Sequence, residues 1–425
     1  MQNFDGISMI NMDKNVFLGE NAKKNILVLT PIYPADDLEK GETPVVHYFT
    51  KEWVKLGCNV LVMHYYVNFP EFLYAMLRPF KSKLSSIFGC TILMSKVTER
   101  QYFLDGVHVC RIPMMKYWPH SRFRKKEIDN AFDKTLLYLK KIGFTPDAIA
   151  AHWVNPCFDL MHRLKKVFSV PTCYIAHDAG KDLLGIYKNE SAEYIRETNV
   201  FGYRSKRIKC DFERYFCCQE KRNFMCFSGI PKDYLCSYDL QPRAFDKIEK
   251  FIFVGTLINR KYPAEIIPAL KIAMGNELFK MTYIGVGAEE KKIIKYAQKY
   301  RCEQNVNLCG FVERKKVVER LMLNDVFIMI SKNETFGLVY LEAMAVGCIV
   351  VASKNEGFDG IIVDNVNGFL CDAGNVDELA SVIKKIKTLS VDRLKEISSN
   401  AVATAQKLTE ENVARAYLNN ILYKG

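Results

Sequence analysis

Short apolar runs alternate with amphipathic stretches along most of the chain. NILVLT (25–30) and NVLVMHYY (59–66) have the composition of buried strands, and PVVHYFTKEWVKLG (44–57) between them has helical spacing and stops at Gly57. Nearly continuous apolar strands separated by helices are typical of a parallel sheet that is covered on both faces. The strands predicted for the first half are 25–30, 59–66, 107–113, 147–153, 171–177 and 223–230, and further helices lie near 123–142 and 156–168.

The alternation is lost at residues 231–249, which hold two prolines, and then begins again. A second doubly wound α/β domain is therefore predicted after a linker. Its predicted strands are 250–255, 280–287, 306–310, 325–331 and 348–353, and its helices lie near 263–275, 288–300, 313–323, 337–346 and 376–388, with two more at 391–406 and 409–422. The predicted boundaries are a leader at 1–20, an N-terminal domain at 21–232, a linker at 233–249, a C-terminal domain at 250–405 and a C-terminal helix at 406–425, a candidate to pack back on the N-terminal domain.

Size and composition narrow the class of protein. A chain of 425 residues, 49% hydrophobic and 25% charged, suits two globular domains. It contains no run of about 18 apolar residues, so no membrane span is predicted. The first twenty residues have neither the basic start nor the apolar stretch of a signal peptide. The fourteen cysteines form no C-x-x-C pair, which favours buried, reduced thiols in a cytoplasmic protein.

The formal net charge of +12 is unevenly distributed. Residues 72–126 hold eleven Lys and Arg against two acids, and the aromatic, basic stretch EFLYAMLRPFKSKLSSIFG (71–89) overlaps this region. An anionic membrane surface or a polyanion would each suit this segment, and a solvated basic face is the alternative. Nucleic acid is not expected, because no binding motif accompanies the charge. The residues assigned to the acceptor or membrane side are Lys81, Lys83, Arg122, Arg124, Lys125 and Lys126.

Two glutamates bracket the start of an apolar helix in SKNETFGLVYLEAMAVGCIVVAS (331–353). Glu334 follows a predicted strand, and the helix beginning near Gly337 presents free N–H groups, which suit a phosphate. Glu342 lies further along this helix, directly before the apolar AMAVGCIVVAS, where a ligand hydroxyl is a good partner for a carboxylate. The alternative is that Glu334 caps the helix and that Glu342 is a solvated helix residue.

This segment, with the downstream EGFDG and NGFL, resembles the donor-site signature of family 4 retaining glycosyltransferases, in which two glutamates have the spacing E-x7-E. NILVLTPIYP, AHWVNP, YIAHD and FVGTLINRKYP resemble other segments of the family, so the similarity covers roughly residues 25–390. The resemblance implies the GT-B fold, in which two Rossmann-like doubly wound parallel-sheet domains face a cleft.

The resemblance also implies roles for individual residues. Glu334 would hold hydroxyls of the transferred sugar, Glu342 the ribose hydroxyls, and Lys261 the diphosphate. His177 would face the donor sugar, although a structural histidine is the alternative. Thr256 stands where the family often has arginine, and Arg260 is a candidate replacement. The implied catalytic residues are Glu334, His177 and Lys261, and the implied donor-binding residues are Gly41, Gly255, Thr256, Arg260, Lys261, Thr335, Phe336, Gly337, Leu338 and Glu342.

A departing nucleotide diphosphate needs a positive partner, either a metal ion or fixed donors. The chain has no D-x-D sequence, so we expect Lys261, Arg260 and the helix N-terminus to serve, without a metal or other cofactor. GVG (285–287) is an incomplete dinucleotide fingerprint, and NAD is not expected. The expected partners are a nucleotide-sugar donor, a glycan or lipid-linked acceptor and an anionic membrane surface, the inner face of the plasma membrane.

The predicted function is thus a hexosyl- or related transferase that acts with retention, in the synthesis of a bacterial-type surface polysaccharide or lipid-linked glycan. Three alternatives stay open. The first is a catalytically silent GT-B scaffold that partners another transferase. The second is a nucleotide-sugar epimerase of the same fold, and the third is a protein that only binds polyanions.

Overall fold

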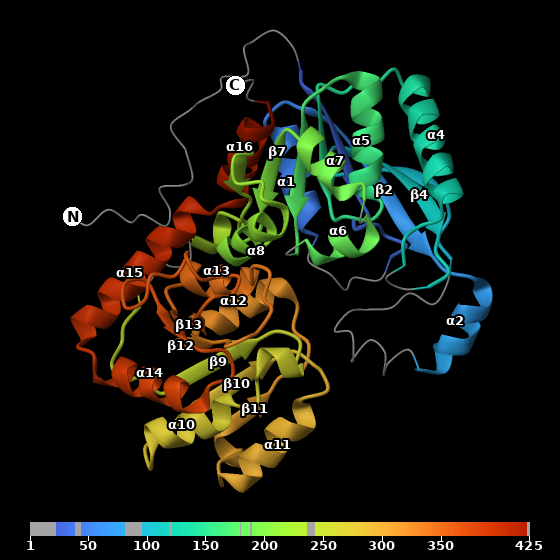
Figure 1. Cartoon of the computed structure of the whole chain (residues 1–425). Coiled ribbons are helices and arrows are strands. Elements are labelled where there is room, and N and C mark those ends of the chain that lie inside the picture. Colours follow the sequence, from blue (N-terminus) through green and yellow to red (C-terminus); the bar gives the residue numbers. More distant parts are fainter. Residues whose placement is uncertain are drawn as a thin grey trace. The chain divides into compact units, whose positions relative to one another are not determined.

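The computed structural model describes residues 23–38, 44–80, 96–118, 121–178, 180–187, 189–235 and 243–422. The chain forms two compact units, whose elements are labelled in Figure 1. The N-terminal unit takes in the described residues up to Phe227 and those from Glu410 onward, and the C-terminal unit is Ser228–Thr409. The chain therefore leaves the N-terminal unit at 227 rather than at the predicted 232, and returns to it at 410.

The N-terminal unit is built on an eight-stranded sheet with the strand order β3-β4-β2-β1-β5-β6-β7-β8. Neighbouring strands are parallel except β3 and β4, which form an antiparallel hairpin through Asp105 and Gly106. The strands are β1 (Asn25–Thr30), β2 (Asn59–Asn68), β3 (Arg100–Leu104), β4 (Val107–Met115), β5 (Ala148–His152), β6 (Thr172–Ala176), β7 (Val200–Tyr203) and β8 (Asn223–Met225).

Two of these strands, β3 and β7, are absent from the sequence prediction. β3 is an edge strand with alternating exposure, and its Phe103 is exposed, so it has no continuous apolar run. β7 is four residues long and includes Gly202, which is too little pattern to stand out. The helices of the unit are α1 (Val45–Lys55), α2 (Glu71–Leu77), α4 (Lys125–Lys141), α5 (Cys157–Phe168), α6 (Lys181–Ile186), α7 (Ser191–Glu197), α8 (Lys206–Phe216) and α16 (Glu410–Leu422), and the 3-10 turn η1 (Arg78–Phe80) follows α2.

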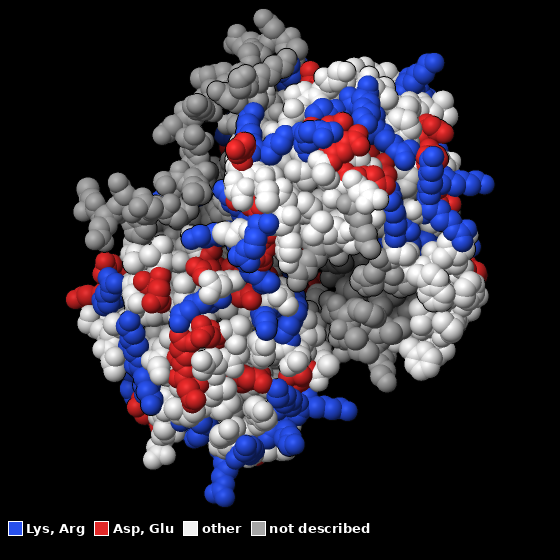
Figure 2. All heavy atoms as spheres, viewed as in Figure 1, with Lys and Arg blue, Asp and Glu red and all other residues white. Residues whose placement is uncertain are grey.

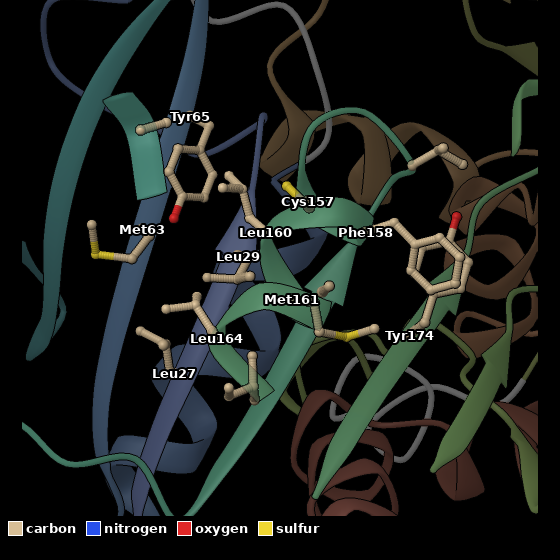
Figure 3. Packing of buried hydrophobic residues seen from close by; sticks show 14 of the residues in the cluster. Leu27, Leu29, Met63, Tyr65, Cys157, Phe158, Leu160, Met161, Leu164 and Tyr174 are labelled. Carbon is tan, nitrogen blue, oxygen red and sulfur yellow. The ribbon is translucent and has the colours of Figure 1, made fainter. Parts of the chain in front are cut away.

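Both faces of this sheet are covered by helices. Leu27 and Leu29 of β1 share one face because strand side chains alternate, and there they meet Leu160 and Leu164 of α5 (Figure 3). On the opposite face α1 packs against the C-terminal helix α16, and the Trp53 indole N–H donates to the carbonyl of Ala414 at 2.8 Å. The last helix of the chain is thus part of the N-terminal unit.

The C-terminal unit has a six-stranded parallel sheet with the order β11-β10-β9-β12-β13-β14. This is the strand order of a dinucleotide-binding doubly wound sheet. The strands are β9 (Lys250–Val254), β10 (Lys280–Ile284), β11 (Val306–Leu308), β12 (Val326–Ile328), β13 (Ile349–Ser353) and β14 (Phe369–Cys371). The helices are α10 (Ile266–Met274), α11 (Glu290–Lys299), α12 (Arg314–Met322), α13 (Leu338–Ala345), α14 (Val376–Thr388) and α15 (Val391–Lys407), with 3-10 turns η2 (Asn259–Lys261) and η3 (Glu303–Asn305). The doubly wound fold predicted for both halves is confirmed, although β14 was not predicted.

The described part of the segment predicted as a linker packs against the C-terminal unit. Phe245 and Ile248 are buried, and the Arg243 guanidinium donates to the carbonyls of Leu321 at 2.7 Å and Val346 at 3.1 Å. The described residues 243–249 of this segment are therefore part of the compact C-terminal unit.

Charged side chains are mixed in sign on the visible surface. Figure 2 shows Lys and Arg interspersed with Asp and Glu over α4 and α5. Across the described residues, every helix is too short or too polar to cross a membrane.

Candidate functional site

The strand order of the C-terminal unit reverses between β9 and β12, which are neighbours in the sheet. In open parallel sheets, ligands bind beyond the carboxyl ends of the strands at such a switch point. Here β9 leads into residues 255–262, and β12 leads into residues 331–337. Most of the donor-binding residues implied by the sequence lie in these two loops.

The two loops are joined directly. The N–H of Lys332 donates to the carbonyl of Arg260 at 2.7 Å. The Arg260 guanidinium lies 3.4 Å from Glu334 Oε2, and Lys261 Nζ lies 3.9 Å from the same oxygen. Two cations therefore converge on one carboxylate, which is only 12% exposed. Burial lowers the pKa of Lys261, Glu334 opposes this shift, and Arg260 adds to it.

Gly255 and Thr256 connect β9 to this cluster. Gly255 has φ +150°, and a Cβ there would lie 3.0 Å from Lys261 Nζ. Glycine at this position therefore leaves room for the lysine ammonium beside the backbone. Thr256 follows in the same loop, and its carbonyl accepts the N–H of Ile258 at 3.0 Å.

A third segment, 356–360, supports the loop that carries Glu334. The carboxylate of Glu356 accepts the Glu334 backbone N–H at 3.0 Å. A Cβ on Gly357 would lie 2.5 Å from the Glu334 carbonyl oxygen and 2.7 Å from the Phe336 nitrogen. The EGFDG turn therefore needs glycine because the two backbones touch.

Gly337 begins the helix α13 in the left-handed conformation, with φ +80°. A Cβ there would lie 2.5 Å from the ring of Tyr340, whose hydroxyl donates to the Met329 carbonyl at 2.5 Å. The helix has no side-chain cap, so the alternative in which Glu334 caps it is wrong. Thr335, Phe336, Gly337 and Leu338 thus form the approach to the positive end of α13.

Glu342 is buried inside α13 and is 5% exposed. The alternative in which it is a solvated helix residue is therefore wrong. Its Oε1 accepts a hydrogen bond from Arg314 Nε at 2.7 Å. Burial raises the pKa of Glu342, and Arg314 counteracts that shift.

Sequence reasoning overlooked Arg314. It is the first residue of α12, just after the loop that leaves β11. The signal in the sequence is weak, because FVERKK is one of several basic clusters. Only the fold brings this arginine to the carboxylate 28 residues away in the chain.

His177 lies directly after β6, in the N-terminal unit. The other described residues that the sequence implied for catalysis and donor binding lie in the C-terminal unit. Its ring stacks on Trp153 with centroids 3.9 Å apart, and its Nε2 lies 3.0 Å from Nδ1 of His152. Burial holds the pKa of His177 well below its ordinary value, and His152 and Arg204 lower it further.

The structure describes only some of the residues predicted for the acceptor side. Lys81 and Lys83 lie outside the described residues, as does Gly41, which was predicted for the donor side. Arg122 forms an ion pair with Glu190 at 2.9 Å, so it is not a freely solvated cation. The Arg124 guanidinium lies 3.9 Å from the ring centroid of Tyr117, and Lys125 and Lys126 are exposed at the start of α4.

Within the described ranges, no three His, Cys, Asp or Glu side chains gather closely enough to hold a metal ion. Metal-independent chemistry stays a prediction.

Comparisons with known proteins agree with the fold. Residues 240–404 match the family model described as "Glycosyl transferases group 1". The chain is 31% identical over 101 residues to N-acetyl-alpha-D-glucosaminyl L-malate synthase of Bacillus anthracis, covering 24% of this chain and 26% of that protein. It is 27% identical over 248 residues to an uncharacterized glycosyltransferase of Methanocaldococcus jannaschii, covering 56% of this chain and 65% of that protein. The chain thus spans less than two thirds of the length of both relatives.

Among solved structures, the chain is similar to Anabaena HepE in complex with UDP, with a TM-score of 0.63 and 16% identity over 93% of this chain and 98% of that one. The identity is low, so this likeness speaks for the fold alone. Together with the two parallel-sheet units, it confirms the GT-B fold class.

Proposed function

We propose that the protein is a glycosyltransferase that moves a sugar from a nucleotide diphosphate-sugar to a glycan acceptor. The observation that carries the proposal is the convergence of Arg260, Lys261 and Glu334 at the start of α13. This cluster lies at the switch point of a dinucleotide-type sheet and inside the segment that matches the group 1 family model.

In this proposal the diphosphate binds where positive charge is concentrated. The Lys261 ammonium and the Arg260 guanidinium neutralise the charge that develops as the bond to the sugar breaks. The N–H groups at the start of α13 add the positive end of the helix dipole. Fixed donors of this kind supply the stabilisation without a metal ion.

The two glutamates take the hydroxyl groups of the donor. Glu334, held by its backbone bond to Glu356, accepts from the sugar hydroxyls, and Glu342 accepts from the ribose. The bond from Arg314 to Glu342 orients that carboxylate and opposes the rise in its pKa that burial causes. The resemblance to family 4 implies that His177 contacts the transferred sugar and that the reaction proceeds with retention.

The acceptor is a lipid-linked or polysaccharide glycan, and we propose that the segment 72–126 holds it at an anionic membrane. Phe72, Met76 and Phe80 follow one another at four-residue intervals on α2 and η1, and they are 63%, 57% and 55% exposed. Exposed apolar side chains next to a basic segment suit a membrane interface. Reversing the charges of Arg124, Lys125 and Lys126 should then weaken sedimentation with anionic liposomes, whereas unchanged sedimentation would contradict the membrane proposal.

The test of the donor site is thermal unfolding with UDP, GDP, ADP and dTDP, each with and without EDTA. Ligands that bind only the native state stabilise it, by about 2.7 kcal/mol at a hundredfold excess over Kd. A rise in melting temperature with one nucleotide, kept in EDTA, supports a metal-independent donor site. No rise with any of the four would favour the catalytically silent scaffold.

A further inference from the structure

A chain of hydrogen-bonding groups connects the C-terminal helix to His177. The Tyr417 hydroxyl of α16 lies 3.2 Å from His152 Nε2, at the end of β5. On the other side of the same ring, His152 Nδ1 lies 3.0 Å from His177 Nε2. All three residues belong to the N-terminal unit.

The side chains of Tyr417, His152 and His177 are uncharged at neutral pH. Burial and, to a smaller extent, the Arg204 guanidinium lower the pKa of His152 to about 3. The same two causes, together with His152, keep the pKa of His177 well below neutrality. Burial raises the pKa of Tyr417 well above its ordinary value, so the phenol keeps its proton. Each imidazole therefore carries one proton, on one of its two nitrogens.

The hydroxyl of Tyr417 determines which ring nitrogen of His152 carries the proton. This hydroxyl lies 3.2 Å from His152 Nε2, and the Cys173 thiol also influences its pKa. A neutral imidazole nitrogen is a strong acceptor, whereas sulfur is a weak one. The phenol therefore donates to His152 Nε2.

The proton positions on His152 and His177 follow because each hydrogen bond contains one proton. Because His152 Nε2 accepts, the proton of this ring is on Nδ1 and is donated to His177 Nε2. His177 Nε2 is then occupied as an acceptor, and the proton of His177 must be on Nδ1. Among the described residues, no hydrogen-bond partner contacts His177 Nδ1, while Trp153 stacks on the ring and holds its plane.

We propose that Tyr417 and His152 are positioning residues that hold His177 as a neutral ring with its proton on Nδ1, so that it presents an N–H donor to the donor substrate. The ligand atom is then an oxygen, either a sugar hydroxyl or a phosphate oxygen, and His177 does not act as a base. The link to a substrate rests on the proposed function. The protonation pattern itself does not.

The reverse pattern makes the opposite prediction. If His177 donated from Nε2 to His152, then His152 would donate to the phenol oxygen, and the Tyr417 proton would be left with the thiol. His177 Nδ1 would then be a bare acceptor. The two patterns differ in which ring nitrogens are protonated, and this can be measured directly.

The experiment is ¹⁵N NMR of the full chain labelled at its histidines, without ligand, since protonated and bare ring nitrogens have well separated shifts. The spectrum of His177→Asn identifies the His177 signals. We expect a protonated Nδ1 and a bare Nε2 in the wild type. A protonated Nε2, or a doubly protonated ring at pH 7, would overturn the proposal.

Tyr417→Phe keeps the packing of α16 and removes the proton that sets the pattern. We expect the His177 signals to shift toward a mixture of the two neutral forms. The matched control is Tyr65→Phe, which removes another buried hydroxyl of the same unit, bonded to Thr135 at 2.9 Å, and leaves the His177 signals unchanged. Equal spectra for Tyr417→Phe and wild type would contradict the role of the phenol.

His152→Asn tests the second positioning residue, because an amide N–H can replace Nδ1–H as the donor to His177. We expect it to keep the Nδ1-protonated form of His177, whereas His152→Leu loses it. If nucleotide diphosphates fail to bind while these signals behave as expected, the proposed function and the contact of His177 with a donor both fail. The inference that Tyr417 and His152 set the position of the His177 proton then still stands.

Discussion

Replacing Lys261 by methionine removes one positive charge from the candidate donor site and keeps a side chain of similar length. The Lys261 side chain is 14% exposed, and its ammonium lies 3.9 Å from the Glu334 carboxylate. Arg260, 3.4 Å from the same oxygen, remains in the variant. The substitution therefore removes one of two cations that the proposal assigns to the diphosphate.

The structure sets the scale of the effect. Two unit charges at the Lys261–Glu334 distance of 3.9 Å attract by about 4 kcal/mol when the effective dielectric constant is about 20. A phosphate oxygen at a comparable distance gains a similar attraction, and desolvation removes much of it. Hydrogen bonds to charged groups contribute about 1.5–3 kcal/mol net. Since about 1.4 kcal/mol is a factor of ten, we expect Kd to rise about 10- to 150-fold.

The assay is isothermal titration calorimetry with the nucleotide diphosphate that raises the melting temperature, at low salt. Lys292→Met is the matched control, because Lys292 is paired with Glu265 at 2.6 Å in the same unit but lies on α11. We expect the control to bind as the wild type does. A folded Lys261→Met variant with wild-type affinity would refute the assignment of Lys261 to the donor site.

Three further predictions follow from the same structure. Gly357→Ala puts a Cβ within 2.7 Å of backbone atoms, so the loop must move, and calorimetry should show nucleotide affinity lowered at least about tenfold. Arg314→Met leaves Glu342 buried without this ion pair, so urea unfolding should show a loss of about 3 kcal/mol that shrinks as acid protonates Glu342. Burial lowers the pKa of both His64 and His152 to about 3, so only the unfolded chain takes up their protons below about pH 6.5, and each should remove about 2 kcal/mol of stability between pH 7 and pH 5.

These predictions have internal controls. Gly185→Ala adds a Cβ in open space and should bind nucleotide as the wild type does. Adding Glu342→Gln to Arg314→Met removes the buried charge and should restore part of the stability. His64→Gln should flatten the fall in unfolding free energy between pH 7 and pH 5. An equally steep fall in that variant would show that His64 is protonated in the folded state.

The sequence predicted the fold class well because its signals are local. Continuous apolar strands, helical spacing and stops such as Gly57 depend on neighbouring residues, and they indicated two doubly wound units. The strands that were missed, β3, β7 and β14, are short or lie at a sheet edge, where burial imposes little pattern. The extent of the supposed linker was wrong for a related reason. Irregular sequence does not reveal that Arg243 is packed against the C-terminal unit.

The candidate site was predictable only in part. Glu334, Gly337 and Glu342 lie in one continuous stretch, so motif spacing pointed to them, and Lys261 lies in a second short stretch. The partners of these residues lie far away in sequence. Arg314 reaches Glu342 across 28 positions, and no local pattern marks it.

By itself, the sequence determined the alternation of elements, the presence of two units and the stretch of chain that carries the paired glutamates, because each depends on residues close together along the backbone. Only the tertiary structure decided that Arg260 meets Glu334 across 74 positions and that Tyr417 meets His152 across 265. Such contacts arise when distant segments pack and exclude water. Burial and the partners that folding supplies then shift the pKa of Lys261, Glu342 and His177, and together they decide which proton or charge each group presents.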